Sequence, residues 1–239
     1  MSTGMTPRML VPSMVTLFGL CAGVTTIRFA IEGHMTLAFV AVLVAGVCDG
    51  LDGTIARAVK GTSQFGVELD SLADMVSFGV APAFMLYMWV LHEAPRLGWI
   101  VCLLYVVCAA LRLARFNVDD ASARPIKKTY FTGVPMPIAA YVVLTPLMLL
   151  KGAEDHFFAQ PVFVMGVVVL VALLMVSTVP TFSFKSIKLP FWGALPAFIG
   201  VAVVAALILT DPWLTLAGLG GVYLVSLPVS YLTARRVKI

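Results

Sequence analysis

Long hydrophobic runs, separated by short polar segments, repeat along almost the whole chain. Each run approaches the roughly 20 residues that an α-helix needs to cross the hydrocarbon core of a bilayer. The pattern predicts eight membrane-spanning helices, at residues 13–31, 35–59, 68–91, 97–117, 134–150, 161–180, 192–210 and 213–233. We therefore predict an all-α fold, a polytopic helical bundle that forms one membrane domain over residues 1–239, with residues 1–12 as a short juxtamembrane segment.

The composition supports this class and excludes an ordinary soluble domain. Of the 239 residues, 61% are hydrophobic and 12% are charged, and the mean hydropathy is +1.02. Soluble domains carry about 25% charged residues. No segment before the first span has the pattern of a cleaved signal peptide, so we expect that span to remain as an anchor. The four cysteines lie in predicted spans and are interpreted as small buried hydrophobic residues.

The distribution of Lys and Arg predicts the orientation, because cytoplasmic segments of membrane proteins are enriched in these residues. With the N-terminus inside, thirteen of them fall in inner segments and two, Arg96 and Lys151, fall in outer segments, while Arg28 lies within the first span. We predict an integral protein of a bacterial-type cytoplasmic membrane with both termini in the cytoplasm. The net charge of +4 then reflects this topology and contact with anionic lipids, and does not indicate nucleic acid binding.

Two acidic clusters interrupt the hydrophobic pattern. Asp49 and Asp52 lie near the end of the second predicted span, and Asp70 and Asp74 lie near the beginning of the third. A charge at the centre of a membrane helix costs about 2.5–3.5 kcal/mol on insertion scales, so four would cost on the order of 10 kcal/mol. This cost requires a strong compensating partner. For four carboxylates, that partner is a hard divalent cation such as Mg²⁺ or Mn²⁺.

Helix geometry predicts that the two clusters meet. Asp52 precedes Thr62 in the intervening turn by ten residues and Asp70 follows it by eight, so in an antiparallel pair they reach a similar depth. At about 100° per residue, Asp70 and Asp74 share one stripe of the third helix, and the acids of the second helix share one arc. Two rows of carboxylates are therefore expected to face each other across one cavity, which could hold two metal ions about 3.5–4 Å apart.

Small and basic residues lie on the same faces. Gly53, Ala56 and Gly66 remove side-chain bulk beside the carboxylates, and Arg57 brings a guanidinium group that suits phosphate oxygens. Carboxylates beside such a cation indicate metal-assisted diphosphate chemistry, in which a spare carboxylate could take a proton from an attacking hydroxyl.

The pattern Asp-x2-Asp-Gly-x2-Ala-Arg-x8-Gly-x3-Asp-x3-Asp at residues 49–74 resembles the signature of the CDP-alcohol phosphotransferases, and every fixed position matches. The resemblance implies an enzyme that cleaves a CDP-linked lipid or alcohol and releases CMP. It implies that two metal ions are bound by Asp49, Asp52, Asp70 and Asp74, and that Asp74 is also the general base. It further implies that the CDP group is bound by Gly53, Ala56, Arg57 and Gly66.

Other segments resemble the phosphatidylserine synthase branch of this family. They are Leu111–Asn117, Phe131–Ala140 and Ser177–Lys185. The branch implies CDP-diacylglycerol as donor, L-serine as acceptor, and phosphatidylserine and CMP as products. A fixed cation must then hold the carboxylate of serine, and the candidates are Arg112, Arg115 and Lys185. The segment from Pro12 to Thr16 resembles the Pro-Asn-x2-Thr start of the family, with Ser where Asn is usual.

Two alternatives stay open. The same chemistry could use glycerol-3-phosphate or an inositol phosphate as acceptor, since the inner loops hold enough basic residues for a phosphate. A protein of another class, a cation transporter, could use the aspartates as an intramembrane ion site, but it would be expected to carry acids along a route across the bilayer. Whether the chain forms a homodimer is left open as well.

Overall fold

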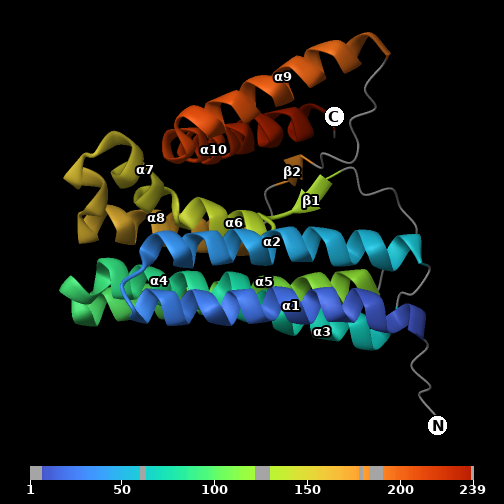
Figure 1. Ribbon diagram of the computed structural model, residues 1–239, viewed down its shortest axis with the longest axis horizontal. Coiled ribbons are helices and arrows are strands. Elements are labelled where there is room, and N and C mark those ends of the chain that lie inside the picture. The colour runs from blue at the N-terminus through green and yellow to red at the C-terminus, as the bar shows by residue number, and fades with distance from the viewer. Residues whose placement is uncertain (1–6, 60–62, 122–129, 178–179, 183–190, 238–239) are drawn as a thin grey trace.

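The computed structural model describes residues 7–59, 63–121, 130–177, 180–182 and 191–237, and helices account for most of them (Figure 1). The described elements, in chain order, are α1 (Pro7–Ile31), α2 (Met35–Ala58), α3 (Gln64–Asp74), the π-helix η1 (Met75–Val80), α4 (Ala81–Trp89), η2 (Leu91–Glu93), α5 (Pro95–Ala121), β1 (Tyr130–Thr132), α6 (Met136–Val143), α7 (Thr145–Ala153), η3 (His156–Ala159), α8 (Pro161–Val176), β2 (Pro180–Phe182), α9 (Phe191–Thr210) and α10 (Pro212–Val237).

The predicted helical membrane bundle is confirmed. Within the described ranges, five helical segments are long and apolar enough to cross a bilayer, as judged by length and composition: Leu10–Ile31, Met35–Ala58, Gln64–Trp89, Pro95–Val118 and Met136–Ala153. Three shorter apolar helices, Pro161–Val176, Phe198–Thr210 and Pro212–Pro228, coincide with the last three predicted spans. From Pro7 onward, the juxtamembrane segment is continuous with α1.

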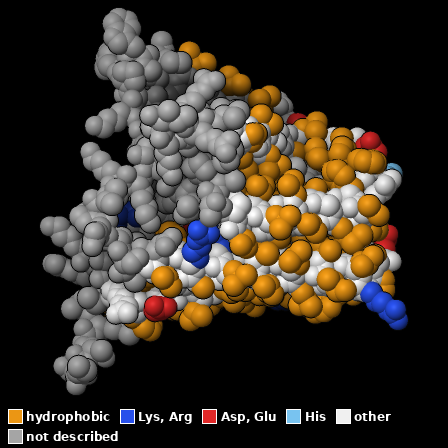
Figure 2. Space-filling model, turned by 180° about the vertical axis from the view of Figure 1, so that it is seen from behind, with side chains coloured by type: hydrophobic (Ala, Val, Ile, Leu, Met, Phe, Trp, Pro, Cys, Tyr) orange, Lys and Arg blue, Asp and Glu red, His pale blue; other side chains and the backbone are white. Residues whose placement is uncertain are grey.

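The surface has the character expected for a protein in lipid. Hydrophobic side chains cover the flank of the bundle, and charged side chains lie toward its two ends (Figure 2). Large hydrophobic residues such as Leu72, Val107 and Leu173 are more than half exposed. Such an exposed apolar surface is unfavourable in water but is matched by lipid chains.

The N-terminal helices form the part of the bundle that carries the acidic clusters. α1 and α2 are antiparallel and pack along their length, joined by a turn in which Gly33 has a φ of +78°. α1 also packs against α3, η1 and α4, and α5 packs against η1, α4 and α8. The largest buried side chains include Phe39, Phe78 and Tyr105, so the core lies between these helices.

The C-terminal hairpin of α9 and α10 lies beside this bundle (Figure 1). α10 packs on α7, α6 and β2. β2 pairs with β1 in antiparallel register, with Phe131 opposite Thr181, and this short ribbon adds to the predicted helices. The ribbon joins parts of Phe131–Ala140 and Ser177–Lys185, two segments that the sequence identified only as motifs.

Two predicted spans differ in detail from the structure. The span predicted at 134–150 is divided at Leu144 into α6 and α7, because Pro146 lacks the N–H that a continuous helix requires. The span predicted at 68–91 begins earlier, at Gln64, since the Ser63 side chain accepts a hydrogen bond from the Gly66 N–H at 3.0 Å and caps the helix. The same span contains the π-helix η1, which periodicity did not indicate.

Candidate active site

Three of the four predicted aspartates meet between α2 and α3. Asp49, Asp70 and Asp74 each place one carboxylate oxygen so that all three lie within 4.8 Å of one another. All three side chains are half-buried. Asp70 and Asp74 are one helical turn apart on α3, and Asp49 approaches them from α2, as the helical period predicted. The two rows of carboxylates therefore share one space.

Asp52 has a different environment from these three. It is only 5% exposed, and its Oδ2 accepts a hydrogen bond of 2.6 Å from the hydroxyl of Thr16 on α1. The Thr16 hydroxyl also lies 3.1 Å from the carbonyl oxygen of Pro12. A hydroxyl has one proton, and the shorter, charge-assisted contact is the stronger acceptor for it. α1 thus orients Asp52 toward the cavity.

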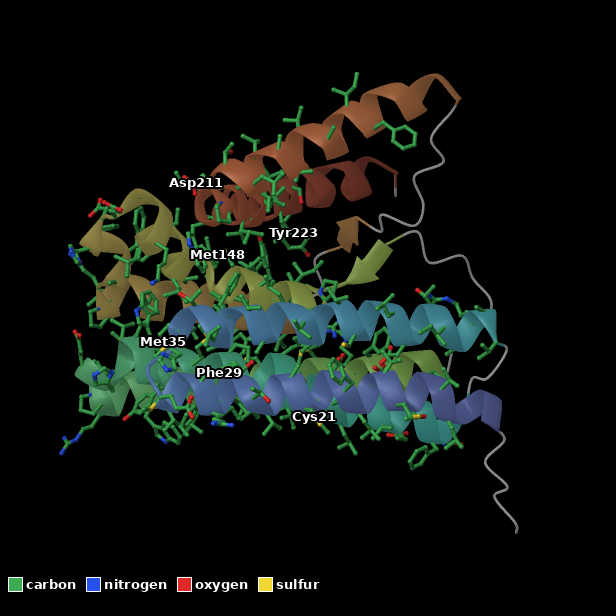
Figure 3. The ribbon with its side chains drawn as sticks, viewed as in Figure 1. Cys21, Phe29, Met35, Met148, Asp211 and Tyr223 are labelled. Carbon is green, nitrogen blue, oxygen red and sulfur yellow. The ribbon has the colours of Figure 1, made fainter. Side chains whose placement is uncertain are left out.

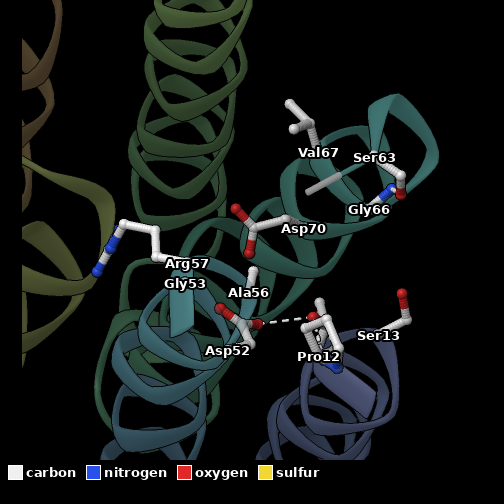
Figure 4. A pocket seen from close by; sticks show the side chains of 11 residues that line it. Pro12, Ser13, Asp52, Gly53, Ala56, Arg57, Ser63, Gly66, Val67 and Asp70 are labelled. Atoms are coloured by element: carbon white, nitrogen blue, oxygen red, sulfur yellow. Dashed lines mark hydrogen bonds between the residues drawn. The ribbon is translucent and has the colours of Figure 1, made fainter. Parts of the chain in front are cut away.

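The residues predicted to bind the CDP group line a pocket of about 170 Å³ next to the carboxylates (Figure 4). Asp52 and Asp70 point into it from α2 and α3. Its walls are formed by residues of α1, α2 and α3 and the turn before α3: Pro12, Ser13, Thr16, Asp52, Gly53, Ala56, Arg57, Ser63, Gly66, Val67 and Asp70. The small side chains at 53, 56 and 66 leave this space open, as the sequence indicated.

Arg57 lies on the rim of this pocket. Its side chain is exposed and extends away from Asp70 (Figure 4), and its Nη2 donates a hydrogen bond to the hydroxyl of Thr54 at 3.3 Å. An ideal Cβ at Gly53 would lie 3.6 Å from Nη1 of Arg57, an ordinary van der Waals distance, so the guanidinium group lies against the helix at this position. A flexible cation at this position is available to a phosphate entering the pocket.

The π-helix η1 begins directly after Asp74. It contains the buried residue Ser77, and an ideal Cβ at Gly23 of α1 would lie 2.2 Å from the Ser77 hydroxyl, so α1 can approach this closely only because residue 23 is glycine. Pro82, four residues after Phe78, has no N–H to donate, and the Phe78 carbonyl accepts a hydrogen bond of 2.9 Å from the fully buried hydroxyl of Tyr105 on α5. π-Helical turns occur often at functional sites, and here one ties the helix of Asp74 to α5.

The three candidate acceptor cations differ in their surroundings. Arg112 of α5 is half-buried, its guanidinium lies 5.7 Å from the ring centre of Phe116, and it interacts electrostatically with Asp74 and Asp49. Arg115 is exposed, and its Nη1 lies 3.5 Å from the Val176 carbonyl oxygen at the end of α8. Lys185 lies outside the described residues. Of the two arginines, Arg112 is therefore the one that interacts electrostatically with the aspartates.

Two residues at the site had no role assigned from the sequence. Thr16 belonged to a segment that was quoted for its resemblance, but nothing in that segment showed that its hydroxyl reaches Asp52. Tyr223 of α10 interacts electrostatically with Arg112. Since it lies in the last predicted span, 111 positions after Arg112, no local pattern connected it with the site.

The donor set of the three clustered aspartates fits a hard divalent cation. Three carboxylates held this close repel one another unless positive charge lies between them. Carboxylate oxygens are ligands that Mg²⁺ and Mn²⁺ prefer. Among the residues that the structure describes, these three aspartates form the one group of at least three Asp, Glu, His or Cys side chains whose ligand atoms lie close enough to hold a metal ion together.

Comparison with known proteins gives concordant matches. The model of the CDP-alcohol phosphatidyltransferase family matches residues 9–172, and that of CDP-alcohol phosphatidyltransferase 2 matches residues 194–228. The first match includes both aspartate clusters and Arg112, and the second includes Tyr223. The family resemblance predicted from the signature is thereby confirmed.

Individual relatives are similar over most of the chain. A CDP-diacylglycerol–serine O-phosphatidyltransferase of Mycobacterium leprae is 36% identical over 221 residues, which cover 92% of this chain and 73% of the relative. One of Helicobacter pylori is 36% identical over 222 residues, covering 92% and 90%. An archaetidylserine synthase of Methanothermobacter thermautotrophicus is 32% identical over 170 residues, covering 70% and 67%.

Proposed function

This chain belongs to the CDP-alcohol phosphatidyltransferase family, and from that premise we propose that it transfers the phosphatidyl group of CDP-diacylglycerol to the hydroxyl of L-serine. The products are phosphatidylserine and CMP. The observation that carries the proposal is the meeting of Asp49, Asp70 and Asp74 within 4.8 Å, with the half-buried Arg112 in electrostatic contact, in a helical membrane bundle. The names of the relatives support serine as the acceptor.

The proposed reaction is a single displacement at phosphorus. The serine hydroxyl oxygen bonds to the phosphorus that carries diacylglycerol, the phosphoanhydride bond on the other side breaks, and the bridging oxygen leaves with CMP. The hydroxyl proton passes to the carboxylate of Asp74, the proposed general base. Positioning the two substrates in line supplies a large part of the rate enhancement in reactions of this kind.

We assign the metal ligands to Asp49, Asp52, Asp70 and Asp74, with two ions of Mg²⁺ or Mn²⁺. When bound, these ions neutralise the diphosphate and the oxygens that bond to and leave phosphorus. Asp49, Asp70 and Asp74 supply the clustered oxygens, and Asp52, oriented by Thr16, lines the pocket on the side of the CDP group. Gly53, Ala56 and Gly66 give the CDP group room, and Arg57 supplies a cation at the rim.

We assign the anchor for the serine carboxylate to Arg112 rather than to Arg115. The guanidinium of Arg112 is shielded from water and lies near the proposed base, and an ion pair in such a place is stronger than an exposed one. Arg112→Ala should raise the KM for serine far more than the KM for CDP-diacylglycerol. Arg115→Ala serves as the matched control and Lys185→Ala tests the third candidate. A normal serine KM in all three variants would show that the acceptor pocket is assigned wrongly.

We also propose that the site opens to the cytoplasm. The aspartates lie toward the end of the bundle where α2 ends and α3 begins (Figure 1). The count of Lys and Arg supports an inner location for that turn. The chain is proposed to act as one catalytic domain, since α10 packs on α6 and α7. Anionic lipids as surface partners and a homodimer remain predictions.

The deciding experiment measures CMP release by the purified protein with CDP-diacylglycerol and a panel of acceptors. We expect release that depends on serine, with one phosphatidylserine formed per CMP. Release with glycerol-3-phosphate or an inositol phosphate, and not with serine, would change the acceptor while keeping the chemistry. No CMP release with any acceptor, together with cation flux in vesicles, would favour the transporter alternative.

A further inference from the structure

α10 turns one face toward the main bundle. On this face Leu216, Gly220 and Tyr223 follow at intervals of four and three residues, which places them in one row of the helix. The hydroxyl of Tyr141 on α6 donates a hydrogen bond to the Leu216 carbonyl, and an ideal Cβ at Gly220 would lie 3.0 Å from the hydroxyl oxygen of Thr145. Along this row, α10 therefore packs on α6 and α7.

Tyr223 continues this row toward the aspartate end of the bundle. Its side chain extends from α10 toward the helices of the bundle, where it packs against the hydrophobic core (Figure 3). It interacts electrostatically with Arg112, which in turn interacts with Asp74. The C-terminal hairpin therefore brings one phenol to the edge of a site that is otherwise built from α1, α2, α3 and α5.

Two polar atoms at this junction are buried and have no hydrogen-bond partner among the residues that the structure describes: Nε of Arg112 and the hydroxyl of Tyr223. A buried polar group without a partner is destabilising, and most such groups in proteins are satisfied. An arginine Nε–H can only donate, and a tyrosine hydroxyl can donate as well. One group with two acceptor oxygens would satisfy both, and a carboxylate is such a group.

We propose that Tyr223 determines acceptor specificity by binding the carboxylate of the acceptor amino acid together with Arg112. The proposal rests on the proposed function, in which that acceptor is serine. The two proposed contacts, one guanidinium and one phenol, carry a single positive charge between them, which matches a carboxylate with one negative charge better than a phosphate with two. The hydroxyl of the bound acceptor is then directed toward Asp74, the neighbour of Arg112.

The test compares Tyr223→Phe with Tyr141→Phe. Both variants lose one phenol hydroxyl and keep the ring, but only Tyr141 donates a hydrogen bond within the protein. Tyr223→Phe should raise the KM for serine roughly 10- to 150-fold, the range expected for one hydrogen bond to a charged group, and leave the KM for CDP-diacylglycerol unchanged. Its thermal midpoint should not fall. Tyr141→Phe should lower the thermal midpoint and leave the serine KM unchanged.

Inhibition by L-alanine gives a second measurement, because L-alanine keeps the carboxylate but lacks the reacting hydroxyl. Its inhibition constant should rise in Tyr223→Phe by the same factor as the serine KM, and that of ethanolamine, which lacks the carboxylate, should not change. An unchanged serine KM, or a lower kcat with an unchanged KM, would overturn the proposal. Failure of the proposed function itself is recognised separately, by wild-type protein that releases no CMP with serine.

Discussion

Thr16 offers the sharpest test of how α1 contributes to the site. Thr16→Val replaces the hydroxyl by a methyl group of similar size and removes the 2.6 Å hydrogen bond to Asp52. The carboxylate is 5% exposed, so water cannot replace the lost donor fully. Hydrogen bonds to charged groups are worth about 1.5–3 kcal/mol, which corresponds to roughly 10- to 150-fold in a binding constant.

The loss of this hydrogen bond should weaken the activation of CMP release by Mg²⁺ or Mn²⁺. Groups that orient metal ligands typically change metal affinity or activity by about 10- to 100-fold when they are removed. We therefore expect the concentration of Mg²⁺ or Mn²⁺ that gives half-maximal CMP release to rise at least about 10-fold in Thr16→Val. Thr16→Ser keeps the hydroxyl and should remain within about 3-fold of wild type, a difference of less than 1 kcal/mol.

Thr26→Val is the matched control. Thr26 lies on the same helix and is fully buried, and its hydroxyl donates to the Ala22 carbonyl oxygen of its own helix at 3.3 Å. The chemical change is identical, but no aspartate is involved, so metal activation should not change. The reasoning is refuted if Thr16→Val and Thr26→Val need the same metal concentration for half-maximal CMP release and have the same KM for CDP-diacylglycerol. Asp52 would then need no orientation from α1.

Four other outcomes are expected. EDTA should abolish CMP release, and Mg²⁺ or Mn²⁺ should restore it, because the clustered ligands are carboxylates. Full turnover in the presence of EDTA would contradict the metal assignment. Asp74→Asn should lower kcat by at least about 10²- to 10⁴-fold with CDP-diacylglycerol binding largely retained, and near-normal turnover would remove Asp74 as the base. Tyr105→Phe should lower the free energy of unfolding in detergent by about 1–3 kcal/mol, since the buried Phe78 carbonyl loses its partner; an unchanged thermal midpoint would show that this bond contributes little. Thr62→Cys should react with a membrane-impermeant thiol reagent in inverted vesicles and not in intact cells, where labelling would contradict the predicted orientation.

Much of the fold and the centre of the site could be predicted because they depend on local regularities. Hydrophobic runs of bilayer length reflect the thickness of the membrane, and they located the helices. The meeting of Asp49 with Asp70 and Asp74 followed from the rise and period of an α-helix on both sides of a short turn. The rise and period of a helix are properties of the backbone, and the thickness of the bilayer is a property of the membrane, so they hardly depend on the rest of the protein.

The details that periodicity missed depend on single residues acting over long distances. The π-helix after Asp74 adds one residue to a turn, and its Phe78 carbonyl is satisfied by Tyr105, 27 positions later. The different surroundings of Arg112 and Arg115 depend on the rotation of α5 against η1 and α8. Three residues apart on one helix, they looked equivalent in the sequence.

By itself, then, the sequence determined the membrane class, the helix pair and the depth of its carboxylates, because a fixed helical period and a fixed bilayer thickness act at every residue. Only the tertiary structure decided that Thr16 of α1 holds Asp52, that Arg112 interacts electrostatically with the aspartates, and that α10 brings Tyr223 to Arg112. These contacts join helices that are far apart in the chain. Which helices meet across such distances is set by the packing of the whole bundle, and the pattern of one segment does not name its partner.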